Sequence, residues 1–202
     1  MIQKEELIKE FKEHYGVMRT SELGSIGLNS RQIKHYIDEN VLSKIKTGIY
    51  ELSNHSVPDE IRIAKLFPTA VLYLESALLH YGYTDRIPAN WQIAVDRDIS
   101  KPQFKMAYLA VTPFYIDKKY IEIGVTTFEV DGTKVRIYDR DRTICDVLRY
   151  ANKLEKEVFN HAIQRYVRDN NRNINNLMKY AKILRVTEKV KMYVAQRCNV
   201  KE

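Results

Sequence analysis

The sequence predicts an α+β chain, in which short helices and a two-stranded ribbon come first and a small, mainly antiparallel sheet and a helical bundle follow. The first observation is that apolar residues recur every three or four positions up to about Glu39, a spacing typical of helices. The second is a change to strand-like patterns between Trp91 and Tyr138, after which helical spacing returns from Arg142. Because strands and helices are segregated along the chain, the α+β class is favoured.

Two short helices are expected first. From Gln3 to Tyr15 the apolar residues fall on one stripe, and Gly16 is a residue type that commonly ends a helix. A second helix is expected to begin at Thr20 or Ser21, because both residue types can cap a helix N-terminus.

A third helix is expected from about Ser30 to about Glu39, opened by a capping box between Asn29 and Gln32. Its apolar residues face one way, and its basic side chains project from the other side. Those basic residues are Arg31, Lys34 and His35. Their place near the N-terminal half suits a helix that contacts bases, because recognition helices do so with their N-terminal residues.

A two-stranded ribbon is expected next, over Leu42–Lys46 and Ile49–Leu52, with a tight turn at Gly48. Helices followed by a basic-edged ribbon are the layout of a winged helix-turn-helix, a DNA-reading domain whose wing meets the phosphate backbone. Winged helices also serve as protein-interaction modules, and exposed basic residues are often only solvated. The residues expected to contact DNA are Thr20, Ser21, Asn29, Ser30, Arg31, Lys34, His35, Lys44, Lys46 and Thr47.

The segment Ser53–Pro58 has turn chemistry and is expected to link two domains, residues 1–57 and 58–202. The boundary could lie as late as Gly82, because two further helices are expected in between, one from Pro58 to near Phe67 and one that carries Leu72. Strands are then expected at Trp91–Val95, Tyr108–Val111, within Ile121–Val130 and at Lys134–Tyr138, with a hairpin turn at Asp131-Gly132. Helices are expected at Arg142–Tyr150, Leu154–Asp169, Ile174–Leu184 and Thr187–Arg197.

Composition excludes several classes of protein. With 45% hydrophobic and 29% charged residues over 202 positions, the chain is globular. No apolar run reaches the length of a membrane span and the N-terminus reads as an amphipathic helix, so we expect a cytoplasmic protein without a membrane partner. Cys145 and Cys198 form no CxxC pair and have no histidine cluster nearby, so neither a disulfide, a metal site nor a cofactor is expected.

The net charge of +7 points to an anionic partner, and its distribution is uneven. Residues 1–57 carry no net charge, residues 58–133 carry −2, and residues 134–202 carry +9. DNA binding by the N-terminal domain alone leaves the positive charge of residues 134–202 unexplained. A second basic surface is therefore considered near the last long helix, and a solvated face, nucleic acid and an acidic protein remain open as its environment. Its residues are Arg172, Lys179 and Lys182.

Four segments resemble the AbiEi family, the antitoxins of type IV toxin–antitoxin systems in abortive phage infection. The most specific runs from Ile137 to Asp146 and reads Ile-Tyr-Asp-Arg-Asp-Arg-Thr-Ile-Cys-Asp, followed by Val-Leu-Arg. The other three match the family in the same order along nearly the whole chain: Thr47–Tyr50, Ser76–Gly82 and Asn176–Lys182. The resemblance implies a transcriptional autorepressor that binds operator repeats of its own operon. It also implies a C-terminal domain that counteracts a cognate nucleotidyltransferase toxin without a stable complex.

The run from Asp139 to Asp146 alternates in charge at a strand–helix junction, and Asp141 is placed to cap the helix that follows. A structural salt-bridge cluster and a toxin-neutralising or nucleotide-related site both remain open for it. Two carboxylates on a turn are weak grounds for a cation site. The residues considered for an antitoxin role are Asp139, Asp141, Arg142, Thr143 and Asp146.

Two other classes of function compete with a DNA-binding antitoxin. One is a DNA-binding regulator fused to an unrecognised nuclease-like enzyme, and the other is a pure protein-interaction module. The sequence contains no Walker loop, HExxH or GxSxG motif, and no acidic set followed by a lysine on an expected strand. No enzymatic activity is therefore expected.

Overall fold

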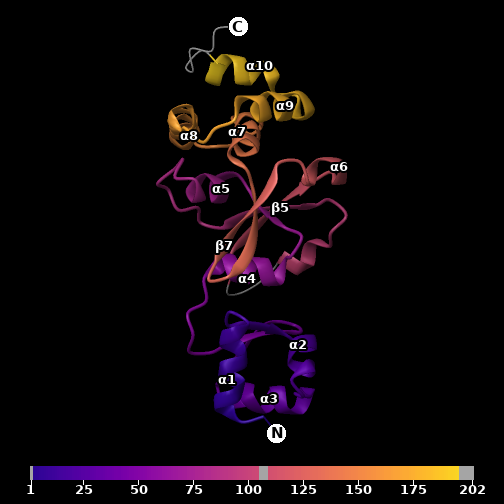
Figure 1. Cartoon of the computed structure of the whole chain (residues 1–202). Coiled ribbons are helices and arrows are strands. Elements are labelled where there is room, and N and C mark those ends of the chain that lie inside the picture. The colour runs from indigo at the N-terminus through magenta and orange to yellow at the C-terminus, as the bar shows by residue number, and fades with distance from the viewer. Residues whose placement is uncertain (1, 105–108, 196–202) are drawn as a thin grey trace. The chain divides into compact units, whose positions relative to one another are not determined.

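The computed structural model describes residues 2–104 and 109–195, which divide into two compact units. The first contains the described residues up to Thr69, with Leu109 and Phe128–Val135. The second contains Ala70–Phe104, Ala110–Thr127 and the described residues from Arg136. Both units contain helices and strands, the sheets are antiparallel and mixed, and the last helices follow the strands, so the α+β class is confirmed (Figure 1).

The first unit begins with three helices and a three-stranded antiparallel sheet in the order β1-β3-β2. The helices bury one face each against a shared apolar core that includes Leu7, Phe11 and Ile33. A fourth helix follows the sheet. The elements are α1 (Lys4–Glu13), β1 (Val17–Arg19), α2 (Thr20–Ser25), α3 (Ser30–Asp38), β2 (Leu42–Lys46), β3 (Ile49–Leu52) and α4 (Asp59–Leu66).

The third helix and both ribbon strands are confirmed as expected, whereas β1 was not anticipated. The capping box is also confirmed. The Gln32 amide donates to Asn29 Oδ1 at 3.0 Å, and the Asn29 amide donates to Gln32 Oε1 at 2.9 Å.

The cap expected at the second helix is wrong. Residue Arg19 holds the N-cap position, and neither Thr20 nor Ser21 caps the helix. The Arg19 amide donates to Glu22 Oε2 at 2.6 Å, so a carboxylate inside the first turn satisfies the free amide in place of a hydroxyl.

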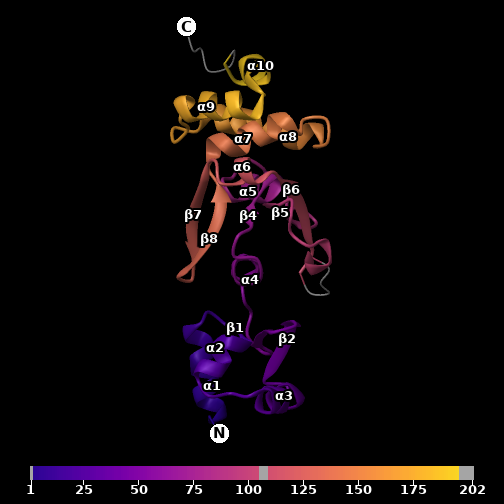
Figure 2. The same ribbon diagram turned by 90° about the vertical axis from the view of Figure 1, so that its right-hand side faces the viewer.

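A five-stranded sheet in the order β6-β5-β4-β8-β7 belongs mostly to the second unit, with the tip of its last hairpin, Phe128–Val135, grouped with the first. Strand β5 pairs antiparallel with β4 and parallel with β6, and β4 pairs parallel with β8. The sheet is therefore mixed, and the expected mainly antiparallel sheet is wrong. Figure 2 shows the β7–β8 hairpin and the β5–β6 pair on either side of β4. The elements are β4 (Val71–Leu72), α5 (Leu74–His80), β5 (Trp91–Asp96), a 3-10 turn (Lys101–Phe104), β6 (Val111–Ile116), α6 (Lys118–Ile121), β7 (Val125–Val130) and β8 (Thr133–Tyr138).

Two of the expected elements are displaced. Residue Leu72 lies in β4, although it was expected in a helix. The strand expected at Tyr108–Val111 instead begins at Val111, and Tyr108 lies outside the described residues. The hairpin turn is confirmed, because Asp131 and Gly132 both take positive φ, at 47° and 81°.

The helical bundle is confirmed, and both views place its four helices together beyond one end of the five-stranded sheet (Figures 1 and 2). Its core includes Ile144, Leu148, Ala162 and Tyr166, all fully buried. The expected last helix reached Arg197, which lies outside the described residues. The helices are α7 (Arg140–Arg149), α8 (Lys156–Arg168), α9 (Ile174–Leu184) and α10 (Thr187–Val190), the last continued by a π-helical turn over Lys191–Ala195.

Candidate functional site

Helix α3 separates its apolar and basic side chains onto opposite faces. Ile33 and Tyr36 are each 3% exposed, and the Tyr36 hydroxyl donates to the carbonyl of Ile2 at 2.6 Å. The basic residues Arg31 and Lys34 are exposed, and among the described residues no carboxylate pairs with either. Their charges are thus available to an external anion.

His35, the third basic residue of α3 predicted to contact DNA, has a carboxylate neighbour. His35 is exposed, but its Nε2 lies 3.3 Å from Oε1 of Glu39, one helical turn later. The residue that follows α3 therefore supplies a carboxylate that competes for His35, whereas Arg31 and Lys34 have no such partner in the described part of the chain.

The polar residues predicted to contact DNA lie at the starts of α2 and α3. Asn29 and Ser30 are exposed at the start of α3, and Thr20 and Ser21 are exposed at the start of α2. The Thr20 amide donates to the carbonyl of Gly48 at 2.9 Å, so the start of α2 is fixed to the turn of the ribbon. The structure brings Thr20 and that turn together.

The two ribbon lysines lie in different environments. A β-bulge shifts the register between Lys44 and Lys46, so that Lys44 opposes Tyr50 and Lys46 opposes Ile49. Lys44 is exposed, whereas Lys46 is half-buried with its Nζ 5.5 Å from the centre of the Phe67 ring. Lys46 therefore packs against its own unit, and Lys44 presents the more accessible charge.

Helix α4 is fastened to the three-stranded sheet by charged contacts. Arg62 donates to Glu51 at 2.9 Å and to Asp59 at 2.8 Å, and Arg19 donates to the carbonyl of Lys65 at 2.6 Å. Burial lowers the pKa of Arg62, but the two carboxylates outweigh it and raise that pKa. These contacts hold the first unit together without using the basic face of α3.

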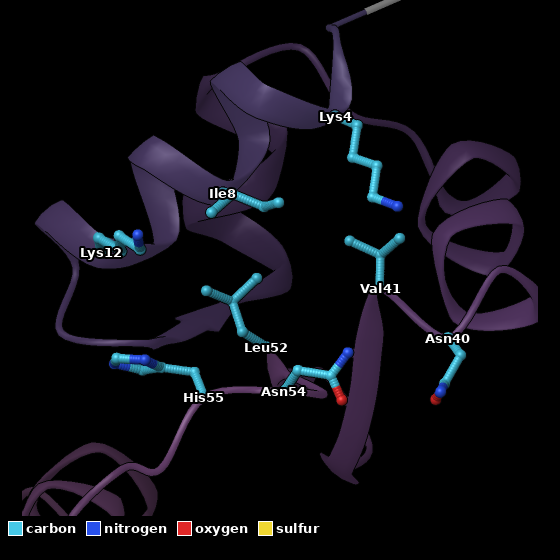
Figure 3. Close-up of a pocket in the computed structure, with 8 residues that line it drawn as sticks. All are labelled: Lys4, Ile8, Lys12, Asn40, Val41, Leu52, Asn54 and His55. Atoms are coloured by element: carbon cyan, nitrogen blue, oxygen red, sulfur yellow. The ribbon is translucent and has the colours of Figure 1, made fainter.

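The first unit also contains an open pocket of about 270 Å³ between α1 and the ends of the ribbon strands. Ile8, Val41 and Leu52 project into it from different sides, with Lys4 and Lys12 at its rim (Figure 3). None of the residues expected to contact DNA lines it. The remaining lining residues are Asn40, Asn54 and His55.

In the second unit, Arg142 of α7 is completely buried and has four partners. Its Nε donates to Asp146 Oδ2 at 2.8 Å, and both side chains are 0% exposed. Its Nη1 donates to the carbonyls of Tyr120 at 2.9 Å and Ile123 at 2.6 Å, and its guanidinium lies 4.2 Å from the centre of the Tyr138 ring. Burial raises the pKa of Asp146, and the Arg142 charge opposes that shift.

The cap at the start of α7 is a different aspartate from the one expected. Asp139 is the N-cap of α7 and accepts from the Arg142 amide at 2.7 Å, so the cap assigned to Asp141 is wrong. Asp141 is buried inside the first turn, where it accepts from the Tyr166 hydroxyl at 2.8 Å and the Asn173 amide at 2.9 Å. Helix geometry places the cap three residues before the amide it satisfies, and Asp139 has that spacing.

The remaining residues of this run are also occupied by the fold. Thr143 is buried and its hydroxyl donates to the carbonyl of Tyr138 at 3.3 Å. Cys145 is buried, and burial raises the pKa of its thiol, so it is held as a neutral thiol. All five residues considered for an antitoxin role thus make intramolecular contacts, and four of them are buried.

The residues of the second basic surface differ in their exposure. Lys179 and Lys182 are exposed on α9, whereas Arg172 is half-buried and donates to the carbonyl of Asp169 at 2.8 Å.

Over the described residues there is no group of three or more histidine, cysteine, aspartate or glutamate side chains that could hold a metal ion. Nor does any helix in residues 2–104 and 109–195 have the length and apolarity needed to cross a membrane.

Comparison with known proteins yields a likeness of fold. No family model matches the chain, and no curated protein matches it either. A similar solved structure is that of the RV2827C protein from Mycobacterium tuberculosis, with a TM-score of 0.63 and 12% sequence identity. The match covers 87% of this chain and 70% of that one. At this identity the likeness extends to the fold alone.

Proposed function

We propose that residues 1–57 form a winged helix-turn-helix that reads double-stranded DNA. Helix α3 enters the major groove, and the β2–β3 ribbon acts as the wing. The observation that carries the proposal is the pair Arg31 and Lys34, two exposed cations to which no carboxylate in residues 2–104 or 109–195 is paired, on a helix whose other face is buried. An arginine in that place can donate two hydrogen bonds to a guanine, the commonest base-specific contact.

The contacts around α3 support this orientation. The capping box fixes the backbone at Asn29, so the polar groups at the helix start are held in place before DNA arrives. The bond from Thr20 to Gly48 couples the start of α2 to the wing, and Lys44 supplies an accessible charge on that wing. A duplex in contact with α3 would meet the wing through its phosphates.

We further propose that the protein is an antitoxin and autorepressor of a type IV toxin–antitoxin operon, acting in the cytoplasm by binding rather than by catalysis. This proposal rests on the resemblance of Ile137–Arg149 and the three accompanying segments to the AbiEi family. Its partners are the operator of its own operon and a neighbouring nucleotidyltransferase toxin, which it counteracts without a stable complex. Because Asp141, Arg142 and Asp146 are buried, we assign them to holding the domain together. Neutralisation then depends on the surface that they support.

The proposal is tested in cells with full-length variants. A reporter driven by the region upstream of the gene measures repression, and survival during expression of the neighbouring toxin measures neutralisation. The double variant Arg31→Ala/Lys34→Ala should lose repression and keep neutralisation. The matched control is Lys4→Ala/Lys9→Ala, which removes two exposed charges from α1, and it should keep both activities.

Repression by the α3 double variant at the wild-type level would refute the recognition-helix assignment. Failure of the wild-type protein to protect against the neighbouring toxin would refute the antitoxin role, whatever the reporter shows.

A further inference from the structure

Two adjoining pockets lie in the second unit, around α6 and the C-terminal ends of α7 and α9. The larger has a volume of about 260 Å³ and the smaller about 100 Å³. Tyr120 and Arg149 line both, so the two pockets are neighbours, and together they are called the depression. Small-molecule sites begin at about 300 Å³, so the pair has the size of a site for a small ligand.

The larger pocket is cationic. It is lined by Lys119, Arg149 and Arg185, and its other lining residues are Tyr120, Ile183 and Leu184. No carboxylate lines it, and within the described part of the chain no carboxylate pairs with any of the three cations. Lys119 Nζ lies 4.9 Å from the centre of the Tyr120 ring, which does not neutralise its charge. Three positive charges that line one pocket favour a multiply charged anion.

Helix ends account for only part of this charge. Arg149 ends α7 and Arg185 follows the last residue of α9, and a cation at a helix C-terminus offsets a partial charge of about −0.5. Two such ends would neutralise roughly one of the three cations, and Lys119 lies on neither helix. Arg185 also takes φ of 59°, a left-handed conformation that is uncommon for a residue with a side chain.

The smaller pocket is aromatic. Tyr115, Tyr120 and Tyr150 line it, together with Arg97, Arg149, Ile116 and Asp117. The Tyr150 ring is held edge-on by Phe114 at 5.7 Å and Tyr73 at 6.1 Å between ring centres. The single carboxylate, that of Asp117, is engaged: it accepts from the Lys119 amide and pairs with Arg97 at 3.4 Å.

We propose that this depression binds a nucleotide. The phosphates lie among Lys119, Arg149 and Arg185, and the base stacks on the tyrosines of the smaller pocket. Lysine side chains cover one face of each ring, with Lys101 Nζ 5.7 Å from the centre of Tyr115 and Lys153 Nζ 5.3 Å from that of Tyr150, so the base stacks on the other face. Every base has a π-face, so this stacking gives affinity with little sequence preference. The site uses part of the +9 charge of residues 134–202, which a DNA-reading first unit leaves unexplained. It does not depend on the operator or antitoxin role.

The buried Arg142 is the positioning residue of this site. Its two bonds to the carbonyls of Tyr120 and Ile123 hold the end of α6, and the Tyr138 hydroxyl adds a bond to the carbonyl of Ile121 at 2.9 Å. A side chain at Gly124 would meet Cβ of Arg142 at 2.6 Å, so the backbone approaches that arginine as closely as glycine allows. The pocket cations of α6 and α7 are therefore connected through one buried guanidinium.

The proposal is tested with the full-length protein by calorimetric titration with ATP, GTP, CTP, UTP, inorganic pyrophosphate and a ten-nucleotide single-stranded RNA. We expect binding of nucleotides, and at least a tenfold loss of affinity in Arg149→Gln/Lys119→Gln. The matched control Arg168→Gln/Lys156→Gln removes two exposed charges from α8 and should bind as the wild type does. Tyr115→Ala should weaken nucleotide binding by about fivefold or more and leave pyrophosphate affinity unchanged, since it removes a stacking surface and none of the three cations of the larger pocket.

Titration with the RNA distinguishes a site for a free nucleotide from a site for a nucleotide within a strand. Binding of the RNA alone, weakened by Arg149→Gln/Lys119→Gln but not by the control, supports the same site filled by a nucleotide within a strand. Absence of binding to every probe at millimolar concentration by folded wild-type protein would overturn the proposal. Equal affinities for the pocket double variant and its control would overturn it as well. Operator binding by the pocket double variant should stay at the wild-type level, which separates this site from α3.

Discussion

Replacing Arg142 by methionine should be the most damaging single polar change in the second unit. Methionine retains the aliphatic part of the arginine side chain and removes the guanidinium group with its charge and donors. Asp146, 0% exposed, would then have no cationic partner, and the carbonyls of Tyr120 and Ile123 would lose a donor. Breaking a buried ion pair by removing one partner costs about 3–5 kcal/mol, and we expect Arg142→Met to fall in that range.

A double variant distinguishes the cost of leaving the Asp146 charge buried without Arg142 from the net contribution of the ion pair to the free energy of unfolding. In Arg142→Met/Asp146→Leu neither member of the pair is charged, and well-packed apolar replacements of buried ion pairs are often near neutral. The double variant should therefore be more stable than the single variant. Arg140→Met is the comparison, because Arg140 pairs with Asp169 at 2.9 Å while 36% exposed, and partly exposed pairs are worth about 1 kcal/mol or less.

Urea unfolding followed by tryptophan fluorescence measures these differences. The chain has one tryptophan, Trp91, in strand β5, so its signal reports the second unit. A loss below about 1 kcal/mol in Arg142→Met, or a double variant less stable than the single one, would refute the reasoning that Arg142 compensates Asp146.

Two further predictions concern the wing and the tyrosines. Lys44→Ala should weaken binding to operator and random duplexes alike and lower the slope of log affinity against log salt by about 1; an unchanged slope would argue against a phosphate contact. Lys46→Ala should in addition lower the stability of the first unit, because Lys46 packs over Phe67. Raising the pH above about 10 should destabilise the protein by about 1.4 kcal/mol per pH unit for each buried tyrosine, since burial raises their pKa and only the unfolded chain ionises there; a urea midpoint that stays constant from pH 9 to 11 would contradict this. The tyrosines concerned are Tyr73, Tyr138 and Tyr166.

Elements built from local signals were predictable. Helix α3 and the β2–β3 ribbon carry their own periodicity, cap and turn, so their positions follow from neighbouring residues. Strands β1 and β4, with three and two residues, are too short to display a period. The parallel pairings of β4 with β8 and β5 with β6 join distant segments, so no local pattern predicts a mixed sheet.

The candidate sites also contain some features that follow from local sequence and others that depend on distant segments. The basic face of α3 follows from helical spacing, and the structure places Arg31 and Lys34 on it as expected. The burial of Arg142 does not follow, because charged residues are rarely buried unless paired, and its carbonyl partners lie about twenty residues earlier in the chain. Lys119 lies in α6, Arg149 in α7 and Arg185 just after α9, so only the folded chain brings them to one pocket.

The central claim is that α3 reads the DNA upstream of this gene, and a titration tests it most directly. A labelled duplex from that region and a scrambled duplex of the same composition are titrated with wild-type protein, Arg31→Ala/Lys34→Ala and Lys4→Ala/Lys9→Ala at a fixed salt concentration. We expect the wild type and the α1 control to prefer the native duplex. The α3 double variant should lose that preference, with each lost base contact costing about 1–3 kcal/mol. Equal wild-type affinity for both duplexes, or an unchanged preference in the α3 double variant, would contradict the claim.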